Sequence, residues 1–402
     1  MSIQTEVISS SGKSDAVQFC AYLEDDESRT VVEQVVRDLV IPHATIAKGS
    51  IRTAIKTLGQ QRSPKTLIVD VCKCDLPLSD INELAEVCEP GVSVIAIGDR
   101  NDVGLFRELL NSGVSDYLVK PITPTLLQRA LFATADGDSR SRQTTRLGRL
   151  VATVGARGGV GATMVATSMA WSIANRRRRR VALLDLDLQF GSVALSLDLE
   201  PTHGLREALE NAGRIDSLYI ERSMVQHSES LFVLSSEEEL NDDMPHDPEA
   251  ANALVGELRN KFHYVIVDLP KTLNKEAHQI LKDATHLVIV TDLSLVGMRD
   301  TLRLMQFALQ SNAACQTTIV VNRVGEYRDG EIAVSEFEKA IGRKIDLRIP
   351  FDAKNVTSAM NIGRPVSSQC KTVGDSIELL IDMLSGMVRT QKPGLLARFW
   401  NR

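Results

Sequence analysis

The sequence predicts an α/β protein of two doubly wound domains, a smaller one followed by a larger one with a mostly parallel sheet. Short apolar, strand-like runs alternate with helical stretches along the 402-residue chain, as in parallel sheets covered by helices. The alternation stops in one polar segment and then restarts. Aromatic residues make up only 4% of the chain, which favours the aliphatic cores of buried parallel sheets.

Composition sets the expected domain boundaries. The segment 134–148 is polar, rich in Arg and Ser and without apolar periodicity, which is typical of a linker. We therefore expect a first domain over 15–133 and a second over 149–390. A flexible N-terminus over 1–14 and a tail over 391–402 complete the division.

The bulk properties favour a cytoplasmic protein. The net charge is −6, and no apolar run reaches the roughly 18 residues of a membrane span. The first residues lack the basic and apolar regions of a secretory signal. The six cysteines are scattered, and the close pair Cys72 and Cys74 has no second pair at zinc-like spacing, so reduced thiols are expected.

The elements of each domain follow from hydrophobic periodicity. In the first domain we expect strands at Val17–Leu23, Thr66–Val71, Val92–Ile97 and Asp116–Val119. The helices expected there are Arg29–Leu39, Ser50–Leu58, Ser79–Val87 and Val103–Asn111. In the second domain we expect seven strands, at Leu150–Val154, Val181–Asp185, Leu231–Leu234, Tyr264–Asp268, Leu287–Thr291, Thr317–Asn322 and Ile345–Ile349. A helical stretch at Met164–Ala174 follows the first of these, and the last helix is expected at Val373–Val388.

A glycine-rich loop, Gly155-Ala-Arg-Gly-Gly-Val-Gly-Ala-Thr163, lies between the first strand of the second domain and its first helix. In that setting, backbone N–H groups and the helix start can bind a phosphate chain. Thr163 offers a hydroxyl for Mg²⁺, but Ala162 stands where such loops carry a lysine for the β- and γ-phosphates. The loop therefore predicts nucleotide binding with weak or absent hydrolysis.

Polar residues end three later strands of this domain. Asp187 belongs to a D-x-D that follows one strand, Asp268 ends another, and Asn322 ends a third. Ligands of open α/β sheets bind at the carboxyl ends of the strands. A carboxylate there can position water or orient Mg²⁺, so these residues are expected beside the glycine-rich loop.

Together these residues resemble the ParA/MinD family of deviant-Walker P-loop ATPases, whose loop reads KGGVGKT where this chain reads RGGVGAT. The likeness covers about Leu150 to Met387. It implies ATP and Mg²⁺ as cofactors and a face-to-face homodimer, in which Arg157 replaces a lysine that reaches the partner's nucleotide. It also implies Asp187 and Arg157 as catalytic residues and Thr163 and Asp268 as metal-binding residues. The nucleotide-binding residues implied by the likeness are Arg157, Gly158, Gly159, Val160, Gly161, Ala162, Thr163, Met164, Asn322 and Pro350.

The first domain resembles a two-component receiver, which has a flavodoxin-like fold. The resemblance rests on the acidic run that contains Asp26, on Asp70 at a strand end and on Lys120 before a proline. It implies that Asp26 and Asp70 bind Mg²⁺ and that Asp70, paired with Lys120, accepts a phosphoryl group. Gly98 stands where receivers carry Thr or Ser, so a pseudo-receiver used for docking or dimerisation is the alternative.

A receiver-like domain ahead of a ParA/MinD-like domain without the loop lysine resembles the CpaE/TadZ family of Flp (tight-adherence) pilus assembly proteins. That resemblance implies a cytoplasmic, polar homodimer that recruits pilus secretion components at the inner membrane. Two alternatives remain: an active ATPase that cycles on DNA or membrane, and a response regulator with Asp70 as its switch. The basic run at 176–180 is either a helix end in solvent or a DNA or lipid patch, with DNA not favoured by the acidic total. The tail 391–402 offers either a weak membrane contact or packing on its own domain.

Overall fold

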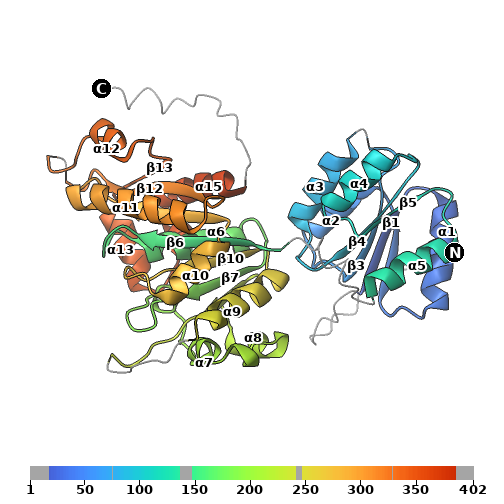
Figure 1. The fold of residues 1–402 in the computed structure, drawn as a ribbon, viewed down its shortest axis with the longest axis horizontal. Helices are drawn as coiled ribbons and strands as arrows, with labels where there is room; N and C mark the ends of the chain where they lie inside the picture. Colours follow the sequence, from blue (N-terminus) through green and yellow to red (C-terminus); the bar gives the residue numbers. More distant parts are fainter. Residues whose placement is uncertain (1–17, 75, 136–146, 241–246, 328, 386–402) are drawn as a thin grey trace, which may run out of the picture. The chain divides into compact units, whose positions relative to one another are not determined.

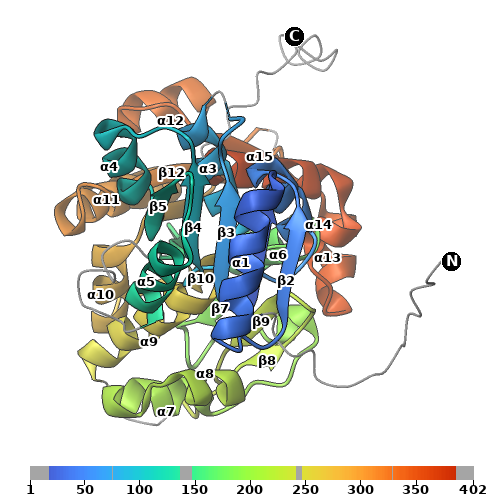
Figure 2. The same ribbon diagram turned by 90° about the vertical axis from the view of Figure 1, so that its right-hand side faces the viewer.

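The computed structural model divides the chain into two compact units, Met1–Arg146 and Leu147–Arg402. Figures 1 and 2 show both units from two sides. The described residues are 18–74, 76–135, 147–240, 247–327 and 329–385. The expected N-terminus 1–14, most of the linker 134–148 and the tail 391–402 therefore lie outside the described part of the chain.

The first unit holds a five-stranded sheet in the order β2-β1-β3-β4-β5, with every pair parallel. Its strands are β1 Phe19–Leu23, β2 Ala44–Lys48, β3 Thr66–Asp70, β4 Ser93–Gly98 and β5 Asp116–Val119. Its helices are α1 Asp26–Asp38, α2 Ile51–Leu58, α3 Pro77–Val87, α4 Val103–Asn111 and α5 Pro124–Ala135. Apolar residues of α1 and α5 pack on one face of this sheet, and those of α2, α3 and α4 pack on the other. This is the doubly wound arrangement that the sequence predicts.

Two elements of the first unit are not among the expected ones. β2 is an edge strand whose residues are half-buried or exposed, so it lacks the continuous apolar run that identifies a central strand. It begins directly after His43, which has a left-handed φ of 52°. Helix α5 begins at Pro124, where the missing N–H of proline costs no helical hydrogen bond.

The second unit holds an eight-stranded sheet in the order β13-β12-β11-β6-β10-β7-β9-β8. Its strands are β6 Arg149–Gly155, β7 Val181–Asp185, β8 Val225–Gln226, β9 Leu231–Leu234, β10 Tyr264–Asp268, β11 His286–Thr291, β12 Gln316–Val324 and β13 Leu347–Pro350. Among the described strands of this sheet, only the two-residue β8, which was not expected, pairs antiparallel, with β9. The mostly parallel sheet confirms the predicted fold class.

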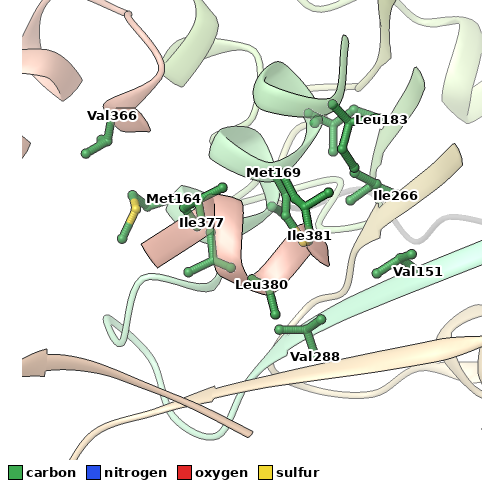
Figure 3. Close-up of a cluster of buried hydrophobic side chains, with 14 of the residues drawn as sticks. Val151, Met164, Met169, Leu183, Ile266, Val288, Val366, Ile377, Leu380 and Ile381 are labelled. Carbon is green, nitrogen blue, oxygen red and sulfur yellow. The ribbon is translucent and has the colours of Figure 1, made fainter. Parts of the chain in front are cut away.

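Helices cover both faces of this larger sheet (Figure 2). Its α-helices are α6 Ala162–Asn175, α7 Gly204–Glu210, α8 Ser217–Ser223, α9 Pro248–Lys261, α10 Lys275–Asp283, α11 Leu295–Ser311, α12 Val334–Ile341, α13 Ala353–Asn361, α14 Val366–Gln369 and α15 Lys371–Ser385. The C-terminal helix α15 packs on α6 and on β13. Figure 3 shows Ile377, Leu380 and Ile381 of α15 beside Met164 and Met169 of α6. The same buried cluster includes Val151, Leu183, Ile266 and Val288 of the sheet, so α6 is held between the central strands and the C-terminal helix.

Candidate functional site

The glycine-rich loop connects the end of the central strand β6 to the start of α6. Gly159 and Gly161 have left-handed φ angles of 79° and 90°, which side chains rarely tolerate. A second constraint also requires glycine at position 161, because a Cβ there would lie 2.6 Å from Nδ2 of Asn322. The loop therefore brings backbone N–H groups to the helix start, as the sequence predicts.

Asn322, two residues before the end of β12, holds the loop in place. Its Nδ2 donates to the carbonyl oxygen of Val160 over 2.8 Å, and its Oδ1 accepts from the backbone N–H of Arg323 over 2.9 Å. The side chain is buried. Sequence reasoning placed Asn322 at the nucleotide, and the structure shows that it also fixes the conformation of the phosphate-binding loop.

Thr163 and Asp268 meet at the carboxyl end of the sheet. Oγ1 of Thr163 donates to Oδ2 of Asp268 over 2.6 Å. The other carboxylate oxygen of Asp268, Oδ1, is buried and has no hydrogen-bond partner among the described residues. Burial and the negative charge of Asp185 raise the pKa of Asp268 well above its ordinary value, although the hydrogen bond from Thr163 opposes the change. A carboxylate in this position favours a cation beside it.

The two aspartates of the D-x-D have different roles. Asp185 is buried and accepts backbone N–H groups from Val193 over 3.0 Å and from Asp187 over 3.1 Å, so it shapes the loop after β7. Burial raises the pKa of Asp185 to about 6. Asp187 accepts from the backbone N–H of Phe190 and lines the central cavity. Of the two, Asp187 is therefore the carboxylate placed to act on a ligand.

Arg157 forms an ion pair that the sequence reasoning missed. Its Nε donates to Oδ2 of Asp292 over 2.8 Å, and its Nη2 contacts the same oxygen. Burial raises the pKa of Asp292, but hydrogen bonds from Arg157 and Ser294 outweigh that effect and the net change is a lowering. Asp292 directly follows β11, so the strand-end pattern that identified Asp268 could have found it. The Arg157 side chain remains 40% exposed.

These elements enclose a cavity of about 570 Å³. All predicted nucleotide, metal and catalytic residues of the second unit line it: Arg157, Gly158, Gly159, Val160, Gly161, Ala162, Thr163, Met164, Asp187, Asp268, Asn322 and Pro350. Residues that sequence reasoning did not include also line it, namely Gly155, Phe190, Gly191, Ser192, Ser196, Leu269, Lys271, Arg323, Glu326, Phe351, Asp352, Ala353, Val356, Thr357, Met360 and Val373. The structure thus brings the predicted site together in one place.

The donor set of the cavity fits a nucleotide with Mg²⁺. At Gly158 and Gly159 of the loop, no atom of the described residues lies within 4 Å of the place where a Cβ would stand. The unpartnered Oδ1 of Asp268 and the hydroxyl of Thr163 are the oxygen ligands that Mg²⁺ prefers. Among the described residues there is no cluster of three or more acidic, His or Cys side chains that could form a metal cage. Magnesium in phosphate sites does not need one, because phosphates and waters complete its shell.

The basic run at 176–180 is largely engaged in contacts within the second unit. Arg177 contacts Glu378 over 3.0 Å and Asp382 over 2.6 Å, both on α15. Arg176 donates to the carbonyl oxygen of Ser367 over 2.8 Å. The guanidinium of Arg180 stacks on the ring of Phe262. The run therefore links the end of α6 to α15, to Ser367 of α14 and to Phe262. This structural role was not predicted from the sequence.

In the first unit, Asp70 and Lys120 meet as predicted. Nζ of Lys120 donates to Oδ2 of Asp70 over 2.5 Å, and Oδ1 of Asp70 accepts the N–H of Cys72 over 2.9 Å. The other acidic contact of Lys120 comes from Asp25, whereas Asp26 is exposed in the first turn of α1. Burial raises the pKa of Asp25, but hydrogen bonds from Lys120 and Ser28 outweigh it and lower the pKa to about 2. The structure thus gives Asp25 the position at the strand ends for which Asp26 was proposed.

Gly98, the departure from the receiver pattern, is covered by Tyr117. A Cβ at Gly98 would lie 2.3 Å from the hydroxyl oxygen of Tyr117 and 2.8 Å from its ring. That ring is buried, and its hydroxyl donates to the carbonyl oxygen of Arg100 over 3.0 Å. The tyrosine therefore fills the space where a receiver's threonine or serine would stand.

Comparisons with known proteins agree with the fold of the second unit. A model of the AAA domain matches residues 148–319. An uncharacterized ATP-binding protein of Methanocaldococcus jannaschii is 30% identical over 206 residues, which cover 50% of this chain and 74% of that protein. A ParA family ATPase from Chlorobium tepidum covers 58% of this chain and 97% of its own, with a TM-score of 0.53 and 23% identity. The septum site-determining protein MinD of Pyrococcus horikoshii, complexed with Mg-ADP, covers 61% of this chain and 100% of its own, with a TM-score of 0.52 and 19% identity.

Shorter matches also occur. A two-component response regulator of Oryza sativa is 27% identical over 105 residues, or 25% of this chain and 77% of that protein. The pilus assembly protein CpaE of Caulobacter crescentus is 31% identical and covers 29% of this chain and 97% of its own, with a TM-score of 0.27. In the described part of the chain, no helix combines the length and apolarity needed to cross a membrane.

Proposed function

The chain belongs to the MinD/ParA-like P-loop ATPases, and on that premise we propose that it is a nucleotide-dependent assembly and positioning factor. We propose further that it binds ATP with Mg²⁺ as a homodimer, with weak or absent hydrolysis. It would act at a cell pole, on the cytoplasmic side of the inner membrane, for a Flp (Tad) type pilus machinery. The order of its two units and the loop without lysine support the pilus role, because that combination resembles the CpaE/TadZ family.

The observation that carries the proposal is the contact between Thr163 and Asp268 beneath a loop that lacks its lysine. The hydroxyl and the unpartnered Oδ1 of Asp268 would hold Mg²⁺, while the N–H groups of the loop bind phosphate oxygens. The relative that was solved with Mg-ADP supports this pairing of cofactors. When bound, Mg²⁺ neutralises the charge of the phosphates.

The side chains of the cavity favour binding over turnover. Ala162, the first residue of α6, presents a methyl group where a lysine ammonium would stabilise the charge of the terminal phosphates. Removing one such electrostatic contact from a site costs about 10²–10³-fold in rate in comparable enzymes. Asp187 lines the same cavity and remains available to position a water molecule. We therefore expect residual hydrolysis to be slow rather than zero.

Arg157 supports the homodimer. In the single chain its guanidinium is held by Asp292, yet a large part of the side chain faces solvent. Arginine has the reach and the fork geometry to bind a phosphate on a second copy of the chain. The dimer would then place each Arg157 against the nucleotide of its partner.

The first unit would act as a docking module rather than as a phosphorylation switch. Lys120 pairs with Asp70 as it would in a receiver, but Tyr117 fills the position of the missing hydroxyl. A receiver without that hydroxyl lacks a donor for the added phosphoryl group. The unit would then offer the surface of its doubly wound fold to a protein partner.

The test measures binding, mass and turnover of the purified full-length chain. Isothermal titration with ATP in the presence of Mg²⁺ gives the affinity, and light scattering gives the mass with and without nucleotide. Tight binding, a dimer with ATP and slow phosphate release are expected. Rapid turnover would favour the cycling ATPase instead, and absence of binding would overturn the proposal. For the pilus role, a chromosomal Thr163→Ala variant should lose pili and polar foci; normal pili would contradict it.

A further inference from the structure

The charges that line the nucleotide cavity single out one basic residue. Among the described residues, the basic side chains along the cavity are Arg157, Lys271 and Arg323. The guanidinium of Arg157 is held by Asp292, and Nη1 of Arg323 lies 3.6 Å from a carboxylate oxygen of Glu326. Lys271 is exposed and forms no ion pair with any described residue. Its ammonium is therefore the free positive charge of this cavity in the described part of the chain.

Lys271 also stands at the end of the cavity where the phosphates are expected. It lies three residues after Asp268, in the segment between β10 and α10, and Asp268 is bonded to Thr163 at the start of α6. Ala162 precedes Thr163 and lines the same cavity. A lysine side chain carries its charge on a flexible four-carbon stem, so it can turn toward a phosphate without movement of the backbone.

We propose that Lys271 supplies, from the segment after β10, the positive charge for the terminal phosphates that the loop lacks at Ala162. This inference rests on the proposed nucleotide binding and names the side chain that replaces the loop lysine. The acidic residues Asp187, Asp268, Glu326 and Asp352 line the same cavity, so a polyphosphate there needs positive charge from the protein in addition to Mg²⁺.

The position of Lys271 also accounts for binding with slow turnover. A lysine on the phosphate loop is fixed at the helix start, whereas Lys271 is exposed to water and adopts its contact only when a phosphate is present. Solvent and salt screen a charge in that setting, so it attracts the anion but gives less stabilisation in a transition state than a fixed, dry charge does. The phosphate contact would therefore strengthen binding more than it accelerates hydrolysis.

The test compares Lys271→Ala with Lys275→Ala in the full-length protein. Lys275 is an exposed lysine four residues away that does not line the cavity, so it controls for net charge. Titration calorimetry with Mg²⁺ and either ATP or ADP gives the affinities. We expect Lys271→Ala to weaken ATP binding about 10-fold and ADP binding less, with Lys275→Ala within about 2-fold of the parent. Lys271→Arg should retain most of the affinity, because charge is the property required.

Salt and a second substitution sharpen the result. The effect of Lys271→Ala should shrink as ionic strength rises, since the charge is exposed. In an Ala162→Lys background the loss caused by Lys271→Ala should be smaller than in the parent, because the two lysines would serve one phosphate. Unchanged ATP binding by Lys271→Ala, in a parent that binds ATP, would overturn this inference alone. Absence of binding by the parent itself would overturn both this inference and the proposed function.

Discussion

Replacing Asp268 by Asn should stabilise the protein in the absence of metal, although it removes a residue proposed to hold Mg²⁺. Asp268 is buried beside Asp185, and one of its oxygens has no partner. In the folded protein without a cation, the ionised carboxylate is therefore disfavoured by burial and by repulsion from Asp185. Asparagine keeps the shape and can still accept the hydrogen bond from Thr163, but it carries no charge.

The buried oxygen Oδ1 of Asp268, which has no hydrogen-bond partner among the described residues, gives the order of magnitude of the effect. A buried acceptor that is left without a hydrogen bond costs about 1–3 kcal/mol, and more if it is charged. Because burial and Asp185 disfavour the ionised carboxyl, Asp268→Asn should gain on the order of 1–3 kcal/mol at neutral pH. For a unit of this size that corresponds to a rise in Tm on the order of 2–10 °C.

The pH dependence follows from the direction of the shift. A carboxyl whose pKa is raised in the folded state stabilises the fold fully below its unfolded value of 3.8, and that contribution is lost as the pH rises through the raised value. With EDTA, the stability of the parent should therefore decline as the pH rises above 3.8, more steeply than that of Asp268→Asn. Addition of Mg²⁺ should stabilise the parent and leave the variant nearly unchanged.

Tryptophan fluorescence is the appropriate assay, because Trp171 and Trp400 both belong to the second unit and the first unit contains no tryptophan. Thermal and urea unfolding would be followed with EDTA and with Mg²⁺. Asp375→Asn, an exposed carboxyl on α15, serves as the control and should change stability by less than about 0.5 kcal/mol. A variant Asp268→Asn that is less stable than the parent in EDTA, or that keeps the full Mg²⁺ effect, would refute the reasoning.

Four further predictions address other parts of the structure. Asn322→Ala should cost about 1–3 kcal/mol and weaken nucleotide binding, because the carbonyl of Val160 loses its buried donor; unchanged urea unfolding would contradict this. Gly161→Ala should cost about 1–3 kcal/mol, since the φ of 90° and the contact with Asn322 both oppose a side chain; circular dichroism melts give the value. Arg177→Ala should destabilise the protein by about 1–3 kcal/mol and leave Glu378 and Asp382 without their partner, whereas Arg178→Ala, an exposed neighbour, should be near neutral in the same melts. Incubation of the parent with acetyl phosphate and Mg²⁺ should add no phosphoryl group to Asp70 by intact mass; an adduct that Asp70→Asn abolishes would show an active receiver instead.

Strand ends could be predicted from the sequence to a large extent. Asp268 and Asn322 each end a continuous apolar run, and such runs are the strongest signal of a buried parallel strand. The glycine-rich loop between a strand and a helix predicted the position of the phosphate site. The left-handed φ angles of Gly159 and Gly161 explain why glycine stands at these positions. For all of these residues, the local sequence and the rules of parallel sheets are sufficient to predict a position at the carboxyl end of the sheet.

Residues whose roles depend on tertiary register could not be placed in this way. In the acidic run after β1, Asp25 caps α1 through the N–H of Ser28 and contacts Lys120, whereas Asp26 is exposed. The strand-end pattern could have found Asp292, but its ion pair with Arg157, 135 positions away, follows from no motif. Lys271 has no strand-end or glycine signal of its own, so only the shape of the cavity identifies it. The half-exposed edge strand β2 was missed for a related reason. Its residues form no continuous apolar run, and only its pairing with β1 identifies it as a strand.

The packing of Tyr117 against Gly98 bears on how the first unit can change during evolution. A single Gly98→Thr substitution would force the buried ring of Tyr117 out of the core, since the new Cβ would lie 2.8 Å from that ring. Removing the ring alone would leave a cavity beside the glycine, which costs about 3–5 kcal/mol for a large aromatic side chain. Each single step is thus unfavourable, and only the two substitutions together would place a hydroxyl at the end of β4. The identities of residues 98 and 117 are therefore coupled: a side chain at position 98 requires a smaller one at position 117.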